Sequence, residues 1–167
     1  RYEKPQAGRL REHHQFGVEY FGSKSAQADA EVICLADTFL RRLGITDLDV
    51  SINSIGCPVC RPEYHRALKE YFGAHIDGLC PLCHTRLEKN PLRLLDCKEE
   101  RCAAIAKNAP MTTDYLCCDC ETHFNTLRAE LEALGVGYKI DTRIVRGLDY
   151  YTKTVFEFVA ANIGSQA

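Results

Sequence analysis

The sequence lacks the features of membrane and secreted proteins. No apolar run approaches the ~20 residues that cross a bilayer, and the first residues show no secretory signal pattern. Charge of neither sign is in excess, since the net charge of the 167 residues is −2 and the pI is about 6.3, which excludes a basic surface over the whole chain. An initiator Met and a closing helix are also missing. We therefore expect an internal piece of a longer cytoplasmic protein.

Cysteine, in contrast, is abundant: the chain has ten, and nine lie between residues 57 and 120. Eight of them form four pairs: Cys57/Cys60, Cys80/Cys83, Cys97/Cys102 and Cys117/Cys120. Such spacing beside long amphipathic stretches favours metal over disulfides. Eight thiolates predict two tetrahedral Cys₄ zinc sites of the structural kind, with packing thiols as the alternative.

The four pairs can combine in two ways. A sequential arrangement joins the first pair with the second and the third with the fourth. A nested arrangement joins the first with the fourth and the second with the third. We favour the nested form, because one site would then close the neck of the cysteine-rich segment, although loop-closure entropy hardly separates the two. Cys118 could replace Cys117 as a ligand, and we expect Cys34 to be a small core residue.

Hydrophobic periodicity indicates an α+β fold with a largely antiparallel sheet and flanking helices. Helical spacing predicts a helix over 25–43, with Val32, Leu35, Ala36, Phe39, Leu40 and Leu43 on its apolar face, and another over 122–134. Alternation predicts strands over 11–22 and 48–56 and within 137–160. Short helices interrupted by cysteines fill the part between.

The chain therefore divides into three parts. Residues 1–56 and 121–167 are expected to form one core. Residues 57–120 are expected to form a small, mainly helical, cysteine-rich insertion within it.

Two polar blocks stand out against this framework. In the first, Gln15, Gly17 and Glu19 share one face of the expected strand, and the glycine leaves space for a ligand between an amide and a carboxylate. Arginines in the preceding loop suit a polyphosphate. A solvated strand face with surface arginines is the alternative. In the second block, "RGLDYY" (146–151), a cation and two tyrosine hydroxyls meet at a break between strand and turn.

These blocks carry a family resemblance. "RYEKPQAGRLREHHQFGVEYFG" (1–22) resembles motif 2 of the class II aminoacyl-tRNA synthetases in its histidyl-tRNA synthetase form, and "RGLDYYTKTVFEF" (146–158) resembles that family's histidine-binding signature. The resemblance implies a class II sheet, ATP and Mg²⁺ as cofactors, histidine and tRNA(His) as substrates, and a homodimer. It implies activation of histidine to histidyl-adenylate followed by transfer to tRNA(His). The insertion would approach the acceptor arm of the tRNA. We expect the piece alone to be inactive.

The resemblance also assigns roles to individual residues. Arg1 and Arg146 would neutralise the α-phosphate during the reaction. The ATP-binding residues would be Arg1, Glu3, Arg9 and His13, and the histidine-binding residues would be Gln15, Glu19, Arg146, Tyr150 and Tyr151. His13 departs from the family, which usually has an aromatic residue there, so we expect weaker or pH-sensitive stacking on adenine.

Two other functions remain open at this stage. One is a non-catalytic paralogue within the family, such as the regulatory subunit of ATP phosphoribosyltransferase. The other is a zinc-stabilised nucleic-acid-binding module, which accounts for the cysteines but for neither polar block. Four histidines near the cysteines, His65, His75, His84 and His123, are possible metal ligands, but we expect them to be surface residues of helices.

Overall fold

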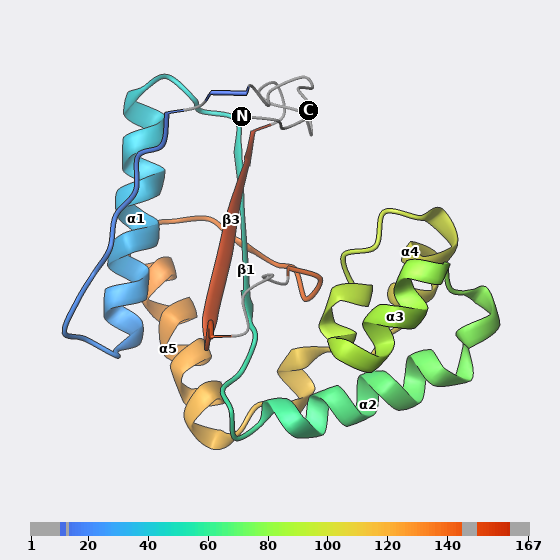
Figure 1. The fold of residues 1–167 in the computed structure, drawn as a ribbon. Helices are drawn as coiled ribbons and strands as arrows, with labels where there is room; N and C mark the ends of the chain where they lie inside the picture. The colour runs from blue at the N-terminus through green and yellow to red at the C-terminus, as the bar shows by residue number, and fades with distance from the viewer. Residues whose placement is uncertain (1–10, 13, 145–149, 161–167) are drawn as a thin grey trace.

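The computed structural model describes residues 11–12, 14–144 and 150–160 of the chain (Figure 1). From residue 25 onward, the described elements follow the predicted order. The longer elements are α1 (Ala26–Arg42), β1 (Leu48–Ser54), α2 (Arg61–Ala74), α3 (Pro81–Lys89), α4 (Glu100–Ala106), α5 (Cys118–Ala133), β2 (Lys139–Ile140) and β3 (Thr154–Ala160). Three short 3₁₀ turns lie at Ile76–Gly78, Pro91–Leu94 and Thr112–Tyr115. No helix in this described part is long and apolar enough to cross a membrane.

A small sheet with the strand order β2-β1-β3 forms the centre of the fold. β3 pairs antiparallel with β1 along its whole length, from Leu48 opposite Ala160 to Ser54 opposite Thr154. β2 pairs parallel with β1 at two positions only, Ser51 opposite Lys139 and Ile52 opposite Ile140. The sheet is therefore mixed, and its antiparallel part dominates, in agreement with the α+β layout expected from the sequence.

Helices α1 and α5 cover one face of this sheet (Figure 1). The strand alternation places Val50 and Ile52 on that face, and the spacing of α5 places Phe124, Leu127 and Leu131 against them. Ile52, Leu127 and Leu131 are fully buried. These apolar side chains form one of the two main hydrophobic cores, which we call the sheet core.

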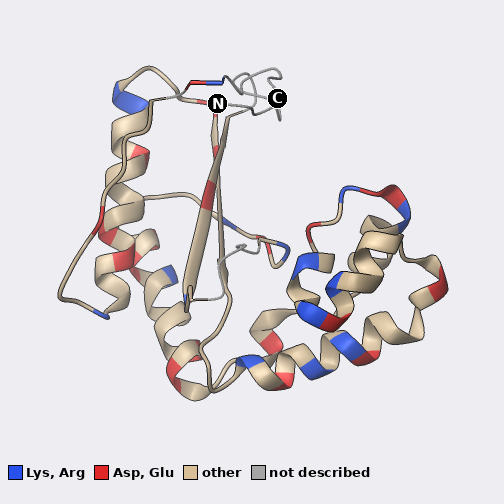
Figure 2. Ribbon diagram, in the orientation of Figure 1, with Lys and Arg blue, Asp and Glu red and all other residues tan. Residues whose placement is uncertain are grey.

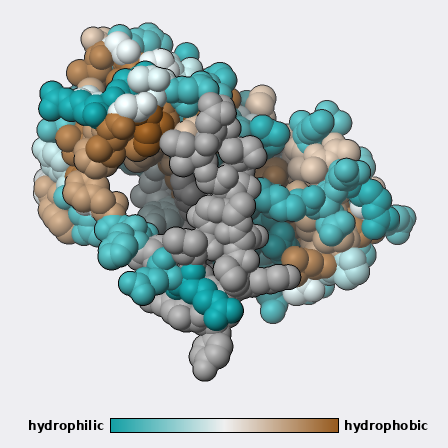
Figure 3. Space-filling model, turned by 90° about the horizontal axis from the view of Figure 1, so that it is seen from above, coloured by the Kyte–Doolittle hydropathy of each residue, from teal (hydrophilic) through white to brown (hydrophobic). Residues whose placement is uncertain are grey.

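The buried face of α1 is not the one that periodicity predicted. Ala26, Ala30 and Ile33 are buried, whereas Phe39 is 42% and Leu43 62% exposed. Small alanines let α1 pack closely against its neighbours, and the larger side chains of its second apolar face remain outside. Ser25 caps the helix as expected, because its hydroxyl accepts a hydrogen bond from the Ala28 N–H at 3.3 Å. Seen from above, hydrophobic side chains gather on the α1 side of the molecule (Figure 3).

The strand predicted over 11–22 was wrong for the residues that the structure describes. Residues 14–22 form no strand and instead run along the outer side of α1 (Figure 1). Phe16 stacks on Phe39, with 5.1 Å between the ring centroids, and is otherwise 77% exposed. A strand needs a partner for its backbone groups, and β1 already has β2 and β3 on its two sides.

The cysteine-rich segment has a hydrophobic core of its own, the insertion core. Tyr64, Leu68 and Phe72 on one face of α2 are at most 1% exposed and pack against α3, α4 and the turns between them. This unit extends away from the sheet beyond the end of β1 (Figure 1). Along its α2, Lys and Arg alternate with Asp and Glu on the solvent side (Figure 2). The two cores share no buried residue.

Candidate functional site

The first cysteine cluster, the neck cluster, lies where the chain enters and leaves the cysteine-rich segment. It contains Cys57, Cys60, Cys117 and Cys120, whose sulfur atoms all lie within 4.8 Å of one another. Cys57 Sγ is 3.7 Å from both Cys60 Sγ and Cys117 Sγ, and Cys60 Sγ is 3.9 Å from Cys120 Sγ. The end of β1 and the start of α5 are thus held at one point.

The second cluster, the inner cluster, lies within the insertion core. Cys80, Cys83, Cys97 and Cys102 are all buried, and their sulfur atoms also lie within 4.8 Å of one another. Cys80 Sγ is 3.9 Å from Cys97 Sγ. The two clusters together follow the nested arrangement that we favoured from the sequence. Cys118 is exposed and belongs to neither cluster, so Cys117 takes the fourth place at the neck.

The separation of the sulfur atoms fits metal ligation. A disulfide requires about 2.05 Å between sulfurs, and all ten cysteines are free thiols. Four thiolates about 2.3 Å from a zinc ion stand about 3.8 Å apart along the edges of a tetrahedron. Three sulfur pairs of the neck cluster and one of the inner cluster, at 3.7–3.9 Å, match that edge, and all pairs within each cluster lie within 4.8 Å. Both donor sets therefore suit a tetrahedral Cys₄ zinc ion.

The sequence around the neck cluster shapes its turn. Gly56 has φ +66°, and a Cβ on it would lie 2.7 Å from Cys60 Sγ, so glycine is required both for the conformation and for the space. The backbone N–H of Cys57 points at Cys60 Sγ at 3.2 Å, and that of Val59 points at Cys57 Sγ at 3.4 Å. In the inner cluster the Cys80 N–H points at Cys102 Sγ at 3.2 Å. Such donors orient and stabilise thiolates.

Each cluster contains a thiol whose pKa is lowered and a thiol whose pKa is raised. The backbone N–H of Cys60 lowers the pKa of Cys57 to about 6, and the backbone N–H of Cys83 lowers the pKa of Cys80 to about 7. Burial raises the pKa values of Cys120 and Cys83. The lowered pKa values favour the thiolate forms of Cys57 and Cys80, which are the forms that bind a metal.

The residues predicted to bind substrate are not gathered into one site by the described part of the chain. Five of them lie outside the described residues: Arg1, Glu3, Arg9, His13 and Arg146. Gln15 and Glu19 are exposed in the segment beside α1, on the far side of that helix from the sheet (Figure 1). Tyr150 and Tyr151 precede β3, with ring centroids 4.9 Å apart.

The burial of two polar side chains near the tyrosine segment was not predicted from the sequence. Asn53 is fully buried on β1, and its Nδ2 donates to the Ile144 carbonyl oxygen at 3.2 Å. The His123 side chain, which we expected at the surface, is 8% exposed, and its Nε2 lies 2.8 Å from Asp29 Oδ2. His123 thereby connects α5 to the first turn of α1. In the sequence, Asp29 in the first turn of α1 was the one sign of a possible partner for His123.

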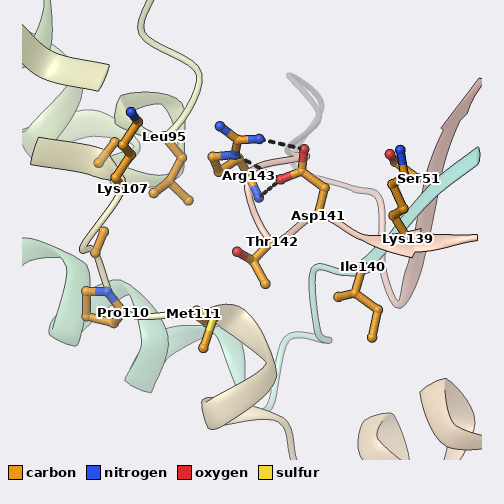
Figure 4. A pocket seen from close by; sticks show the side chains of 12 residues that line it. Ser51, Leu95, Lys107, Pro110, Met111, Lys139, Ile140, Asp141, Thr142 and Arg143 are labelled. Atoms are coloured by element: carbon orange, nitrogen blue, oxygen red, sulfur yellow. Dashed lines mark hydrogen bonds and ion pairs between the residues drawn. The ribbon is translucent and has the colours of Figure 1, made fainter. Parts of the chain in front are cut away.

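A cavity of about 440 Å³ separates the insertion from the open face of the sheet (Figure 4). Lys107, Pro110 and Met111 line it from the insertion, opposite the β2 side of the sheet. Arg143 forms two hydrogen bonds to Asp141 there, Nε to Oδ1 at 3.0 Å and Nη2 to Oδ2 at 3.1 Å. Although burial alone would raise it, these bonds lower the pKa of Asp141. The cavity is thus lined by charged groups of both signs.

Comparisons with known proteins agree on one family. The family model described as histidyl-tRNA synthetase matches residues 1–59. A histidine–tRNA ligase of Caldanaerobacter subterraneus subsp. tengcongensis is 60% identical over 166 residues, which are 99% of this chain and 40% of that protein. One of Acetivibrio thermocellus is 57% identical over the same shares. Among solved structures, apo histidyl-tRNA synthetase of S. aureus matches with a TM-score of 0.63 and 34% identity over 82% of this chain and 32% of that one.

The class of protein defined by these matches is the aminoacyl-tRNA synthetases. The chain belongs to the histidyl-tRNA synthetase family. It spans about 40% of the length of the curated relatives it matches.

Proposed function

We propose that the protein containing this chain is a class II histidine–tRNA ligase. It would activate histidine with ATP to histidyl-adenylate and transfer the histidyl group to tRNA(His). The observation that carries the proposal is the 60% identity to a histidine–tRNA ligase over 166 residues, a match that spans both polar blocks. Residues 57–120 would be an insertion in the catalytic domain formed by 1–56 and 121–167, and the protein would act as a cytoplasmic homodimer.

The proposed chemistry needs no nucleophile from the protein. The substrate carboxylate attacks the α-phosphate, so catalysis depends on positioning and on neutralising charge. Arg1 and Arg146 would neutralise that phosphate, with Mg²⁺ on the phosphate oxygens. Glu3, Arg9 and His13 would complete the ATP site.

Histidine would be recognised through hydrogen bonds to both ring nitrogens. Gln15 would hold the α-amino or carboxylate end, and Glu19 and Tyr151 would bracket the imidazole, with Tyr150 alongside. Because buried polar groups left unpaired reject analogues strongly, this arrangement would select histidine. It requires residues 14–22 to lie beside the tyrosine segment, away from the position along α1 seen in the structure.

The two cysteine clusters would each bind one structural zinc ion. The support is the pair of four-sulfur groups with separations suited to a tetrahedron. The neck cluster would hold Cys57, Cys60, Cys117 and Cys120 on one ion, and the inner cluster would hold Cys80, Cys83, Cys97 and Cys102 on the other. Elemental analysis of the complete protein should find two zinc ions per chain.

Histidine-dependent exchange of pyrophosphate into ATP, measured on the complete protein, tests the catalytic proposal. We expect exchange with histidine and its loss in Arg146→Ala, by a factor of about 10²–10³ if the guanidinium acts like one oxyanion donor. A control, Arg101→Ala on exposed α4, should retain activity. Zinc-loaded protein that supports no exchange would instead favour the non-catalytic paralogue.

A further inference from the structure

The neck of the insertion contacts the tyrosine segment directly. Arg61, the first residue of α2, donates a hydrogen bond from Nη2 to the carbonyl oxygen of Tyr151. The backbone N–H of the same arginine donates to the Cys57 carbonyl oxygen at 3.0 Å. One residue thus connects a cysteine of the neck cluster with a tyrosine of the "RGLDYY" block.

A second connection runs parallel to the first. The Lys153 N–H donates to the Gly56 carbonyl oxygen at 2.8 Å, and the Ile55 N–H donates to the Lys153 carbonyl oxygen at 2.8 Å. Lys153 itself has φ +60°, a conformation that a non-glycine residue keeps only when its surroundings impose it. The backbone that follows Tyr151 is therefore held by the turn that leads into the neck cluster.

His123 of α5 holds the side chain of Lys153. The Lys153 Nζ lies 3.4 Å from His123 Nδ1, and the His123 Nε2 lies 2.8 Å from Asp29 Oδ2. The side chain of Thr154, at the start of β3, lies 3.4 Å from the same Nε2. These contacts fix the start of β3, and Arg61 holds Tyr151, which lies just before that start.

We propose that Arg61 is a positioning residue for histidine binding, acting through Tyr151. The inference rests on the proposed function and deepens it: the neck cluster, through Arg61, sets where the Tyr151 ring stands for the amino acid. ATP binding is assigned to residues of the other polar block, so it does not depend on this contact. The neck cluster would influence the affinity for histidine, and the inner cluster would not.

Steady-state pyrophosphate exchange on the zinc-loaded, full-length protein tests this. Arg61→Ala should raise the KM for histidine about tenfold, as expected from loss of a hydrogen bond from a charged donor, and leave the KM for ATP within about twofold. Arg61→Lys, which keeps a cationic donor of shorter reach, should give an intermediate KM for histidine. Arg66→Ala, on the same helix and paired with Glu63 across an exposed 3.5 Å contact, is the matched control and should match wild type.

Calorimetric titration of histidine into the same variants gives a readout independent of turnover and should show the same order of affinities. Zinc content should stay at the wild-type level in Arg61→Ala. An unchanged KM for histidine in Arg61→Ala overturns the proposal. Equal rises in both KM values, or loss of zinc, overturn it in favour of a purely structural role. Wild-type protein without histidine-dependent exchange would refute the proposed function instead, and calorimetry would still report whether Arg61 affects histidine binding.

Discussion

The insertion core and the sheet core are stabilised by different means. The sheet core contains aliphatic and aromatic side chains from α1, β1 and α5, with Ile52, Leu127 and Leu131 fully buried. The insertion core includes the four cysteines of the inner cluster among its buried residues, and the segment that forms it, residues 57–120, is short. A unit of so few residues gains limited hydrophobic stabilisation and usually needs a cross-link or a metal. The comparison implies that metal removal should affect the two cores unequally.

Chelation of zinc should produce the largest difference between the two cores. Removing zinc should unfold the insertion core at a cost of several kcal/mol, because binding free energy at structural zinc sites is folding free energy. Hydrogen exchange should then lose protection over α2, α3 and α4 and keep it over β1 and α5. Cys83→Ser should act like chelation on the inner cluster, whereas the exposed Cys118→Ser should change neither zinc content nor exchange. Uniform protection after chelation would contradict the prediction.

A substitution that creates a cavity in the sheet core should destabilise that core and leave the zinc sites intact. Leu127→Ala should lower the free energy of unfolding by about 2–5 kcal/mol, through lost transfer energy and a cavity. The control Leu134→Ala, at a position 49% exposed just beyond the end of α5, should cost under about 1 kcal/mol. Denaturant titration measures both, and zinc content should be unchanged in both. Loss of zinc in Leu127→Ala would mean that the two cores are not independent.

Alkaline pH should selectively weaken the insertion core. Burial raises the pKa of Tyr64 to about 12, above its value near 10 in the unfolded chain. The stability contribution is therefore complete below pH 10 and is lost as the pH rises from 10 to 12, by about 1.4 kcal/mol per pH unit. Unfolding of Tyr64→Phe should lack this dependence, although it also loses the hydrogen bond to the Pro110 carbonyl oxygen. If the free energy of unfolding falls equally between pH 10 and pH 12 in wild type and Tyr64→Phe, Tyr64 is not the cause.

The smallest loss of stability is expected for substitutions in residues 14–22, which lie outside both cores. Phe16→Ala removes one stacked aromatic pair on an exposed surface and should cost about 0.5–1.5 kcal/mol. Phe21→Ala, at a position 81% exposed, is the control and should be neutral by thermal unfolding. A large loss in Phe16→Ala would show that residues 14–22 belong to the sheet core after all.

Local patterns in the sequence predicted most of the fold. Capping at Ser25 and the spacing of Phe124, Leu127 and Leu131 placed α1 and α5, and the alternation of Val50 and Ile52 placed β1. The cysteine pairs were visible because ligand spacing is local. Their grouping was only slightly favoured, because loop-closure entropy depends weakly on loop length.

Interactions between distant segments were harder to predict. The buried face of α1 was misassigned, because the helix carries one apolar face with large side chains and another with alanines, and only its partners decide which is covered. The buried positions of His123 and Asn53 depend on Asp29 and Ile144, more than ninety residues away in each case. The strand over 11–22 had the right alternation, but alternation says nothing about whether a pairing edge is present.

The neck cluster has a further consequence for folding kinetics. β1 and α5 pack together although the cysteines that follow one and begin the other are sixty positions apart. Closing so long a loop slows folding, because its entropy is lost before the contacts form. Once four sulfurs gather on one ion, that loop is already closed, and the closure entropy has been offset by metal binding rather than by contacts of the sheet core. Zinc should therefore speed the formation of the sheet core, although the sheet core stays folded after the metal is removed.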